Sequence, residues 1–285
     1  MKKIKGAGER KTLRGAGAVA TAGLVIGALA LAGTARADAP AKSAAHPPEP
    51  KPTVVLEHGA FADASSWNGV ISRLRADGYP VVAAADPLRG PHSDATSLRA
   101  LLGHIKGPKI LVGHSYGGSV ISEAAAYDTG VKALVYVAAF LPAPGESALE
   151  LTNKFPGSTL PDALDPVNTT NPDGSQGTDL YIQQDKFRHQ FAADVPRDEA
   201  ALAAAGQRPV AQSALEEKAT VAAWKTIPSW DVVTTRDLNI PAAAQRFMAA
   251  RAHSHVTEVA ASHSVAVSRP AVVTRVIEDA ARTTR

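Results

Sequence analysis

The sequence predicts an α/β fold in which a mostly parallel sheet is covered by helices on both faces. Three observations predict it. Short apolar, β-branched segments alternate with segments of helical period from residue 53 onward. One apolar segment, residues 109–112, runs directly into Gly113-His114-Ser115-Tyr116-Gly117, which is typical of a sharp turn between a strand and a helix. The alternation breaks over residues 141–212, where scattered Pro, Gly, Asn and Asp indicate an inserted lid rather than sheet.

Residues 1–37 have the pattern of a signal peptide. Six Lys and Arg residues lie among the first 14 residues, an apolar run rich in Ala and Gly follows, and Ala35-Arg36-Ala37 fits a cleavage site. The apolar run reaches the minimum length for a membrane span, so an anchor is the alternative interpretation. The cleavage pattern favours export with removal of the segment after Ala37. We therefore expect a secreted or extracytoplasmic protein with no stable membrane anchor.

Composition excludes several classes of protein. The whole chain has a net charge of +3, but residues 1–37 hold seven of the Lys and Arg residues and one acid. The remainder has 23 basic and 26 acidic residues, a net charge of −3, and no basic cluster, so no nucleic-acid partner is expected. Cysteine is absent, which excludes disulfides, thiol nucleophiles and thiolate metal sites. Residues 38–52 contain four prolines after residue 46 and predict an extended linker.

The remaining chain divides into a core of residues 53–140 and 213–285 and a lid of residues 141–212. Short apolar runs predict six strands, at residues 53–56, 81–84, 109–112, 132–137, 228–234 and 255–259. Helical spacing predicts a helix after each of the first three strands and after each of the last two. Ser65 or Ser66 is the expected N-cap of the first of these helices, and Ser93 or Asp94 of the second. Ser268-Arg269-Pro270 is expected to begin the last helix.

Ser115 is the predicted nucleophile. The glycines two residues before and after it allow a strand and a helix to approach closely around a strained turn. Such a turn exposes the serine hydroxyl and leaves the Tyr116 N–H at a helix N-terminus, where it can bind an oxyanion.

A serine hydroxyl needs a base, and the base needs an orienting acid. In folds with this kind of turn the acid and then the histidine follow the serine along the chain. Asp237 follows the strand at residues 228–234, and His263 follows the strand at residues 255–259. Asp237 could also be an ordinary turn residue and His263 a loop histidine. Asp231 is the second candidate acid, but it lies inside its strand.

The segment His58-Gly59-Ala60-Phe61 directly follows the first strand. Its glycine permits a sharp turn, so the Ala60 N–H can supply a second oxyanion donor beside Tyr116. Phe61 is the alternative donor if the register differs by one residue. His58 and His114 are interpreted as structural, and His253 with His255 has no carboxylate partner that would indicate a metal site.

Four segments, residues 58–61 with Trp67, 113–118, 228–237 and 262–264, together resemble the α/β-hydrolase superfamily. Within it they are most similar to bacterial esterases related to plant methyl esterases and hydroxynitrile lyases. The resemblance covers about residues 53 to 282. It implies a mostly parallel sheet, a lid after the strand that follows the serine helix, and no cofactor.

Together, the residues and the resemblance imply a cofactor-free serine hydrolase acting on small-molecule carboxylic esters. Phe61 and Trp230 are candidates for substrate contact. Seven apolar residues of the lid either line an acyl pocket or pack the lid: Phe155, Leu160, Leu180, Tyr181, Ile182, Phe187 and Phe191. The alternatives are a hydroxynitrile lyase-like C–C lyase and a non-catalytic binding protein. The plant lyases of the family use a lysine that residues 235–239 lack beside the acid.

Overall fold

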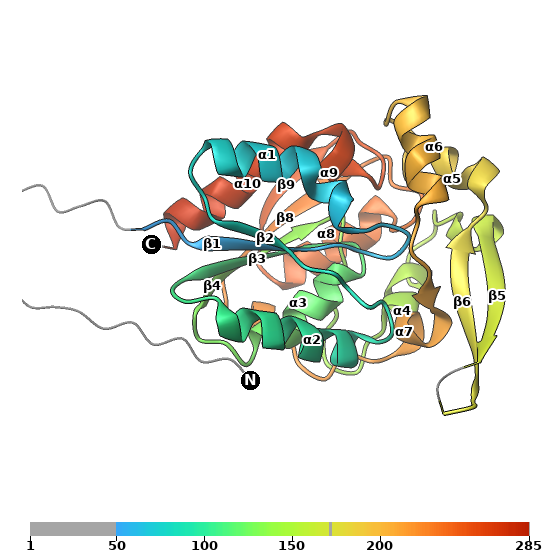
Figure 1. Cartoon of the computed structure of the whole chain (residues 1–285), viewed down its shortest axis with the longest axis horizontal. Coiled ribbons are helices and arrows are strands. Elements are labelled where there is room, and N and C mark those ends of the chain that lie inside the picture. The colour runs from blue at the N-terminus through green and yellow to red at the C-terminus, as the bar shows by residue number, and fades with distance from the viewer. Residues whose placement is uncertain (1–49, 171–172, 285) are drawn as a thin grey trace, which may run out of the picture. The chain divides into compact units, whose positions relative to one another are not determined.

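The computed structural model describes residues 50–170 and 173–284 (Figure 1). The predicted signal peptide, its cleavage site and residues 38–49 of the predicted linker lie outside the described residues. Pro52 is buried, and the Lys51 ammonium lies 4.2 Å from the centre of the Tyr79 ring, so residues 51 and 52 pack on the folded core. Within residues 50–170 and 173–284, no helix is both long and apolar enough to cross a membrane.

The core is built on a six-stranded sheet with the order β2-β1-β3-β4-β8-β9, in which every neighbouring pair is parallel. The strands are β1 (Thr53–Glu57), β2 (Val81–Ala83), β3 (Lys109–His114), β4 (Val131–Val137), β8 (Ser229–Thr234) and β9 (His255–Val259). All six predicted strands are therefore confirmed, with ends that differ by at most two residues. Parallel strands need helical crossovers, which explains the alternation in the sequence.

Helices cover both faces of this sheet (Figure 1). Successive strand residues point to opposite faces, and in β1 Val54 and Leu56 join one core cluster whereas Val55 joins the other. The cluster with Val54 and Leu56 packs against α1 (Asn68–Ala76), α9 (Val265–Ser268) and α10 (Pro270–Thr283). The cluster with Val55 packs against α2 (Pro91–His104), α3 (Gly117–Ala125) and α8 (Ala242–Arg251). The predicted α/β fold with helices on both faces is confirmed.

Two helix starts differ from the prediction. A 3-10 helix, η1 (Ala64–Trp67), precedes α1, and its cap is Asp63, whose carboxylate accepts the Ser65 N–H at 2.7 Å. Helix α2 begins at Pro91, and Asp94 lies inside its first turn, where its carboxylate accepts the N–H groups of the two preceding loop residues at 2.9 and 3.1 Å. Asp can bind free N–H groups from either position, so its presence alone does not fix where a helix begins.

The inserted segment forms a sheet of its own. Strands β5 (Leu164–Thr170) and β6 (Gln176–Ile182) make an antiparallel hairpin, and β7 (Val210–Ala211) pairs with β6. The expectation that this segment contains no sheet is wrong, because most of β5 is exposed and its sequence lacks the alternation of a half-buried strand. Its other elements are α4 (Ala148–Asn153), η2 (Leu160–Ala163), α5 (Gln184–Phe191) and α6 (Arg197–Ala205), and α7 (Gln212–Glu216) and η3 (Ala223–Lys225) lead back to the core.

Asp231 is the most unusual residue of the central sheet. It lies in β8, is 1% exposed, and neither carboxylate oxygen has a hydrogen-bond partner among the described residues. Burial raises the pKa of this carboxyl well above its usual value. The native state therefore holds a proton here that the unfolded chain releases above about pH 4.

This proton predicts how stability changes with pH. Because the native pKa is raised, the carboxyl favours folding fully only below its unfolded pKa, and stability falls as the pH rises towards the native pKa. The substitution Asp231→Asn removes this dependence. In urea titrations, we expect the free energy of unfolding of the variant, relative to the natural sequence, to increase by about 1.4 kcal/mol per pH unit as the pH rises above about 5 towards the native pKa. The exposed Asp165 provides the control Asp165→Asn, and a difference for Asp231→Asn that stays constant with pH would contradict the expectation.

Candidate active site

Ser115 occupies a strained turn directly after β3. Its φ of 53° lies in the left-handed region, which is unfavourable for a residue with a side chain. Three backbone hydrogen bonds hold this conformation. The Ser115 N–H donates to Val137 O at 3.2 Å, and its carbonyl accepts the N–H groups of Gly118 and Phe140 at 3.0 and 3.1 Å. The turn that the pentapeptide predicts is confirmed.

The flanking glycines are required by space. A Cβ atom on Gly117 would lie 2.7 Å from His58 O and 2.8 Å from Glu57 O, and one on Gly113 would lie 2.6 Å from Gly117 O. These distances are shorter than real Cβ contacts, and the atoms approached belong to the backbone, which cannot rotate away. Strand β1, strand β3 and helix α3 therefore meet closely at Ser115, as expected from the sequence.

An imidazole and a carboxylate are paired at the same edge of the sheet. His263, in the loop between β9 and α9, places its Nδ1 2.6 Å from Oδ2 of Asp237 in the loop after β8. A carboxylate accepts hydrogen bonds, so Nδ1 carries the hydrogen and the neutral ring leaves Nε2 free to take a proton. The predicted pairing of these two residues is confirmed.

The Asp237 carboxylate is fully enclosed by donors. Oδ1 accepts the N–H groups of Asn239 and Ile240 at 2.8 and 3.0 Å. Oδ2 accepts the Thr234 hydroxyl at 2.9 Å and the Gln245 amide at 3.0 Å, besides His263. Burial alone would raise the pKa of this carboxyl, but His263 and these donors hold it below its usual value. The carboxylate is therefore ionised throughout the neutral range.

Thr234 and Gln245 are supporting residues that sequence reasoning missed. Thr234 ends β8, and Gln245 lies on α8, eight residues after the carboxylate it contacts. Thr, Gln and Asp occur in every kind of segment, so nothing in their spacing signals this network. Only the packing of α8 against β8 brings the amide to the carboxylate.

Ser115 and His263 line one cavity of about 370 Å³, whereas Asp237 lies behind His263 and does not reach it. Most of the cavity wall is apolar, with Ala60, Phe61, Phe140, Ala148, Leu149, Leu160, Pro161, Leu164, Pro166, Leu180, Phe191, Leu215 and Ile240. An apolar cavity with a few convergent polar groups is typical of a small-molecule site. The inserted hairpin supplies part of the wall, so the segment predicted as a lid covers the edge of the sheet that carries Ser115.

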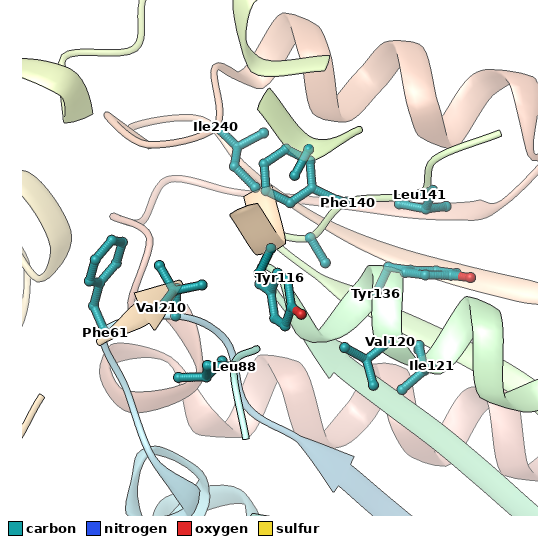
Figure 2. Close-up of a cluster of buried hydrophobic side chains, with 14 of the residues drawn as sticks. Phe61, Leu88, Tyr116, Val120, Ile121, Tyr136, Phe140, Leu141, Val210 and Ile240 are labelled. Carbon is teal, nitrogen blue, oxygen red and sulfur yellow. The ribbon is translucent and has the colours of Figure 1, made fainter. Parts of the chain in front are cut away.

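The two predicted oxyanion donors face the same cavity. Ala60 and Tyr116 both line it, and the N–H of neither donates to any other residue within the described ranges. The N–H of Phe61 donates to Arg208 O at 3.0 Å, which leaves Ala60 as the free donor of its loop. The Tyr116 side chain is buried in the core (Figure 2) and donates its hydroxyl to Asp94 at 2.7 Å, which fixes the backbone beside Ser115.

The oxyanion loop depends on Gly59. A Cβ atom on Gly59 would lie 2.6 Å from the Ser115 Cβ and 2.8 Å from His114 O, so Gly59→Ala should push residues 59–60 away from Ser115. We expect kcat for an ester to fall by about 10²- to 10³-fold, the usual effect of losing one oxyanion donor. Gly103→Ala is the matched control, since a Cβ atom there meets nothing within 4 Å and an alanine near the end of α2 should be neutral or slightly stabilising. Equal kcat values for the two variants would contradict the assignment of this loop.

The remaining histidines and acids near Ser115 hold the loops. His58 Nε2 accepts the Asp86 N–H at 3.1 Å, which agrees with its interpretation as structural. Burial raises the pKa of Glu57 to about 8 and raises that of Asp86, so this pair retains a proton at neutral pH. Burial lowers the pKa of His114 to about 3, so its ring is neutral, and its Nε2 lies 3.0 Å from His263 O, where it donates a hydrogen bond.

The inserted segment is bonded to both loops that carry the imidazole and the carboxylate. At the end of α5, the Gln190 amide donates to Leu238 O at 2.8 Å and to the Asn239 side chain at 3.0 Å. Asp194 accepts the Ser262 hydroxyl and N–H. These contacts were not predictable, because they join positions separated by 48 to 68 residues.

Only one of the two predicted substrate-contact residues lines the cavity. Phe61 does, but Trp230 does not, and the expectation for Trp230 is wrong. Trp230 lies in β8 within the other core cluster, with its ring stacked on His255 at 4.8 Å. Of the seven apolar lid residues, three line the cavity (Leu160, Leu180 and Phe191) and four do not (Phe155, Tyr181, Ile182 and Phe187).

Comparison with known proteins places the chain among hydrolases. Residues 54–276 match the Alpha/beta hydrolase family. Alpha/beta hydrolase nvfD of Aspergillus novofumigatus is 26% identical over 254 residues, which cover 81% of this chain and 97% of that protein. A pyrethroid hydrolase of Sphingobium wenxiniae is 27% identical over 252 residues, covering 79% and 86% of the two chains.

Solved structures share the fold. Polyneuridine aldehyde esterase superposes with a TM-score of 0.71 over 80% of this chain and 98% of its own, at 18% identity. The methylesterase MES16 from Arabidopsis superposes with a TM-score of 0.68 over 81% and 99% of the two chains, at 19% identity.

Proposed function

Because the chain belongs to the alpha/beta hydrolase family, we propose that it is a serine hydrolase that cleaves carboxylic esters through an acyl-enzyme on Ser115. Ester hydrolysis is supported by relatives and structural neighbours named as esterases and hydrolases. The observation that carries the finer proposal is the cavity that Ser115 and His263 share, with Asp237 bonded to the far side of the imidazole.

In the proposed acylation, Ser115 Oγ attacks the ester carbonyl carbon while His263 Nε2 takes the hydroxyl proton. The carbonyl oxygen becomes an oxyanion that accepts the N–H groups of Ala60 and Tyr116, each typically worth about 3 kcal/mol of barrier lowering. Asp237 keeps the hydrogen on Nδ1 and stabilises the imidazolium. The carbon–oxygen bond to the alcohol then breaks, and the proton on Nε2 leaves with the alcohol.

Deacylation repeats these steps with water as the nucleophile. His263 Nε2 takes one proton from the water, whose oxygen bonds to the acyl carbon. The bond to Ser115 Oγ then breaks, Oγ recovers the proton from Nε2, and the carboxylic acid leaves. The ionised Asp237 suits this cycle, because an orienting carboxylate must stay charged while the imidazole gains and loses its proton.

Hydrolysis of p-nitrophenyl esters from acetate to palmitate by the purified protein tests the activity. The apolar wall of the cavity predicts turnover above the spontaneous rate, with a preference that depends on chain length. Rates equal to the spontaneous rate at every chain length would contradict an esterase.

The lyase alternative is not favoured, because the named relatives are hydrolases. No lysine lines the cavity formed by the described residues. A non-catalytic binding protein would have no need of a strained serine in the same cavity as a carboxylate-oriented imidazole.

Export forms a separate part of the proposal and rests on residues 1–37 alone. A mature protein that begins at Asp38 is the expected product in a secreting host. N-terminal sequencing of the protein recovered outside the cytoplasm tests it, and an intact Met1 terminus would contradict it.

A further inference from the structure

A second cavity of about 400 Å³ lies between the inserted helices α5 and α6 and the core segment that runs from Phe61 to Gly69. Apolar side chains supply much of its wall, among them Phe187, Val195 and Val267. Leu202, which is 76% exposed, extends the apolar surface at its rim. Nothing in the proposed reaction uses this space.

The two cavities are separated by a pair of aromatic rings. Phe61 and Phe191 line both cavities, and their rings meet edge to face with centroids 6.2 Å apart. The Phe191 ring also lies 4.9 Å from the ring of His263. The second cavity therefore begins one side chain away from the proposed base.

The backbone on both sides of this partition is held in place. The Phe61 N–H donates to Arg208 O at 3.0 Å, and Phe191 O accepts the N–H and the hydroxyl of Ser264, each at 3.0 Å. Rotation of one or both rings would join the cavities without moving any of these bonds. Such a change alters the side-chain χ angles of the two phenylalanines and leaves the backbone as it is.

The charges of the second cavity restrict what it can hold. Asp63 and Glu199 are its charged residues, and none of the described residues that line it is basic. A carboxylate or phosphate would find no counter-charge there, and the apolar side chains of the wall suit an apolar group.

We propose that this second cavity binds an uncharged apolar arm of the ester, while the other arm occupies the Ser115 cavity. The rings of Phe61 and Phe191 part to let the first arm pass between the cavities. The proposal rests on the proposed ester hydrolysis. An ester carbon at Ser115 carries two diverging arms, and each cavity lies at the small end of the range of about 300–1,000 Å³ typical of small-molecule sites. With the two rings parted, the two cavities together would provide room for two large arms.

Filling the second cavity tests the proposal. Ala203 on α6 lines it, is exposed and does not reach the Ser115 cavity, so Ala203→Trp should narrow it without disturbing the core. Ala201→Trp is the matched control, because Ala201 is exposed on the same helix and lines neither cavity. We would measure kcat/KM in two series, one with a fixed acetyl group and alcohols of increasing size and one with fixed p-nitrophenol and acyl groups of increasing length.

We expect Ala203→Trp to lower kcat/KM by about tenfold or more for the large members of one series, and to leave p-nitrophenyl acetate within about twofold of the natural sequence. The series that responds shows whether the arm is the acyl group or the alcohol. Equal profiles for Ala203→Trp and Ala201→Trp in both series would overturn the second site, while activity on p-nitrophenyl acetate would still support the esterase. Absence of activity on every ester with the natural sequence would overturn the proposed function itself.

A change in the opposite direction gives an independent measurement. Phe61→Leu shortens one ring of the partition, so the ratio of kcat/KM for an ester with two large arms to that for p-nitrophenyl acetate should rise. An unchanged or lower ratio would count against passage between the rings.

Discussion

Replacing Ser115 by alanine is expected to lower kcat for p-nitrophenyl esters by about 10⁴- to 10⁶-fold, because it removes the hydroxyl that we propose as the nucleophile. The hydroxyls of the other hydroxyl-bearing residues that line the cavity have partners of their own: Thr152 donates to Ala148 O at 3.0 Å, Ser158 to Leu238 O at 3.5 Å and Tyr116 to Asp94 at 2.7 Å. Alanine keeps the Cβ atom, so the strained turn is retained. The variant should also fail to react with a fluorophosphonate probe, which labels a serine only when it is activated.

Ser119→Ala is the matched control for this experiment. Ser119 lies on α3 four residues later, is 2% exposed, and its hydroxyl has no partner among residues 50–170 and 173–284. It does not line the cavity, so Ser119→Ala should be labelled and should turn over esters like the natural sequence. Equal labelling of Ser115→Ala and the natural protein would end the case for a serine nucleophile.

Replacing Asp237 by asparagine is expected to lower kcat by about 10⁴-fold and to change KM little. The two carboxylate oxygens of Asp237 accept hydrogen bonds from five donors, but an asparagine amide has only one oxygen that can accept. The NH₂ group of the asparagine must therefore face either another donor or the imidazole. Facing the imidazole, it would hold the wrong tautomer, with the hydrogen on Nε2. Because Asp237 does not line the cavity, substrate binding should be nearly unaffected.

The contrast with Asp231→Asn makes this prediction specific. Both aspartates are buried and six residues apart, but Asp231 lies inside β8 and its carboxylate has no hydrogen-bond partner among the described residues. Asp231→Asn should keep kcat within about threefold while it changes the pH dependence of unfolding. A larger loss of kcat for Asp231→Asn than for Asp237→Asn would reverse the two assignments.

The core of the fold could be predicted from the sequence because its signals are local. The four inner strands of the main sheet, β1, β3, β4 and β8, are largely buried on both faces, and three of them contain a short apolar run such as Val54-Val55-Leu56 in β1. The hairpin β5–β6 could not be predicted in this way. Its first strand is mostly exposed and contains Pro166, and its only local signal is the turn sequence Asp173-Gly174.

The candidate site, like the fold, could be predicted only where its signals are local in the sequence. The pentapeptide around Ser115 and the order of Asp237 and His263 along the chain are sequence signals, and the structure brings the last two into contact. The residues that orient them could not be predicted. Gln245 reaches Asp237 only because α8 packs against β8, and Gln190 and Asp194 come from a segment 48 to 68 residues away. The prediction that Trp230 contacts substrate was wrong, because the position of a residue within a strand does not reveal which face of the sheet its ring occupies.

The bonds from Gln190 and Asp194 to the loops of the imidazole and the carboxylate have a consequence for protein engineering. A chimaera that replaces the inserted segment with that of another protein should retain both side chains, because they help to position the loops that carry Asp237 and His263. The β5–β6 hairpin forms none of these hydrogen bonds. Sequence changes should therefore be tolerated better in the hairpin than in the part of the inserted segment that carries Gln190 and Asp194.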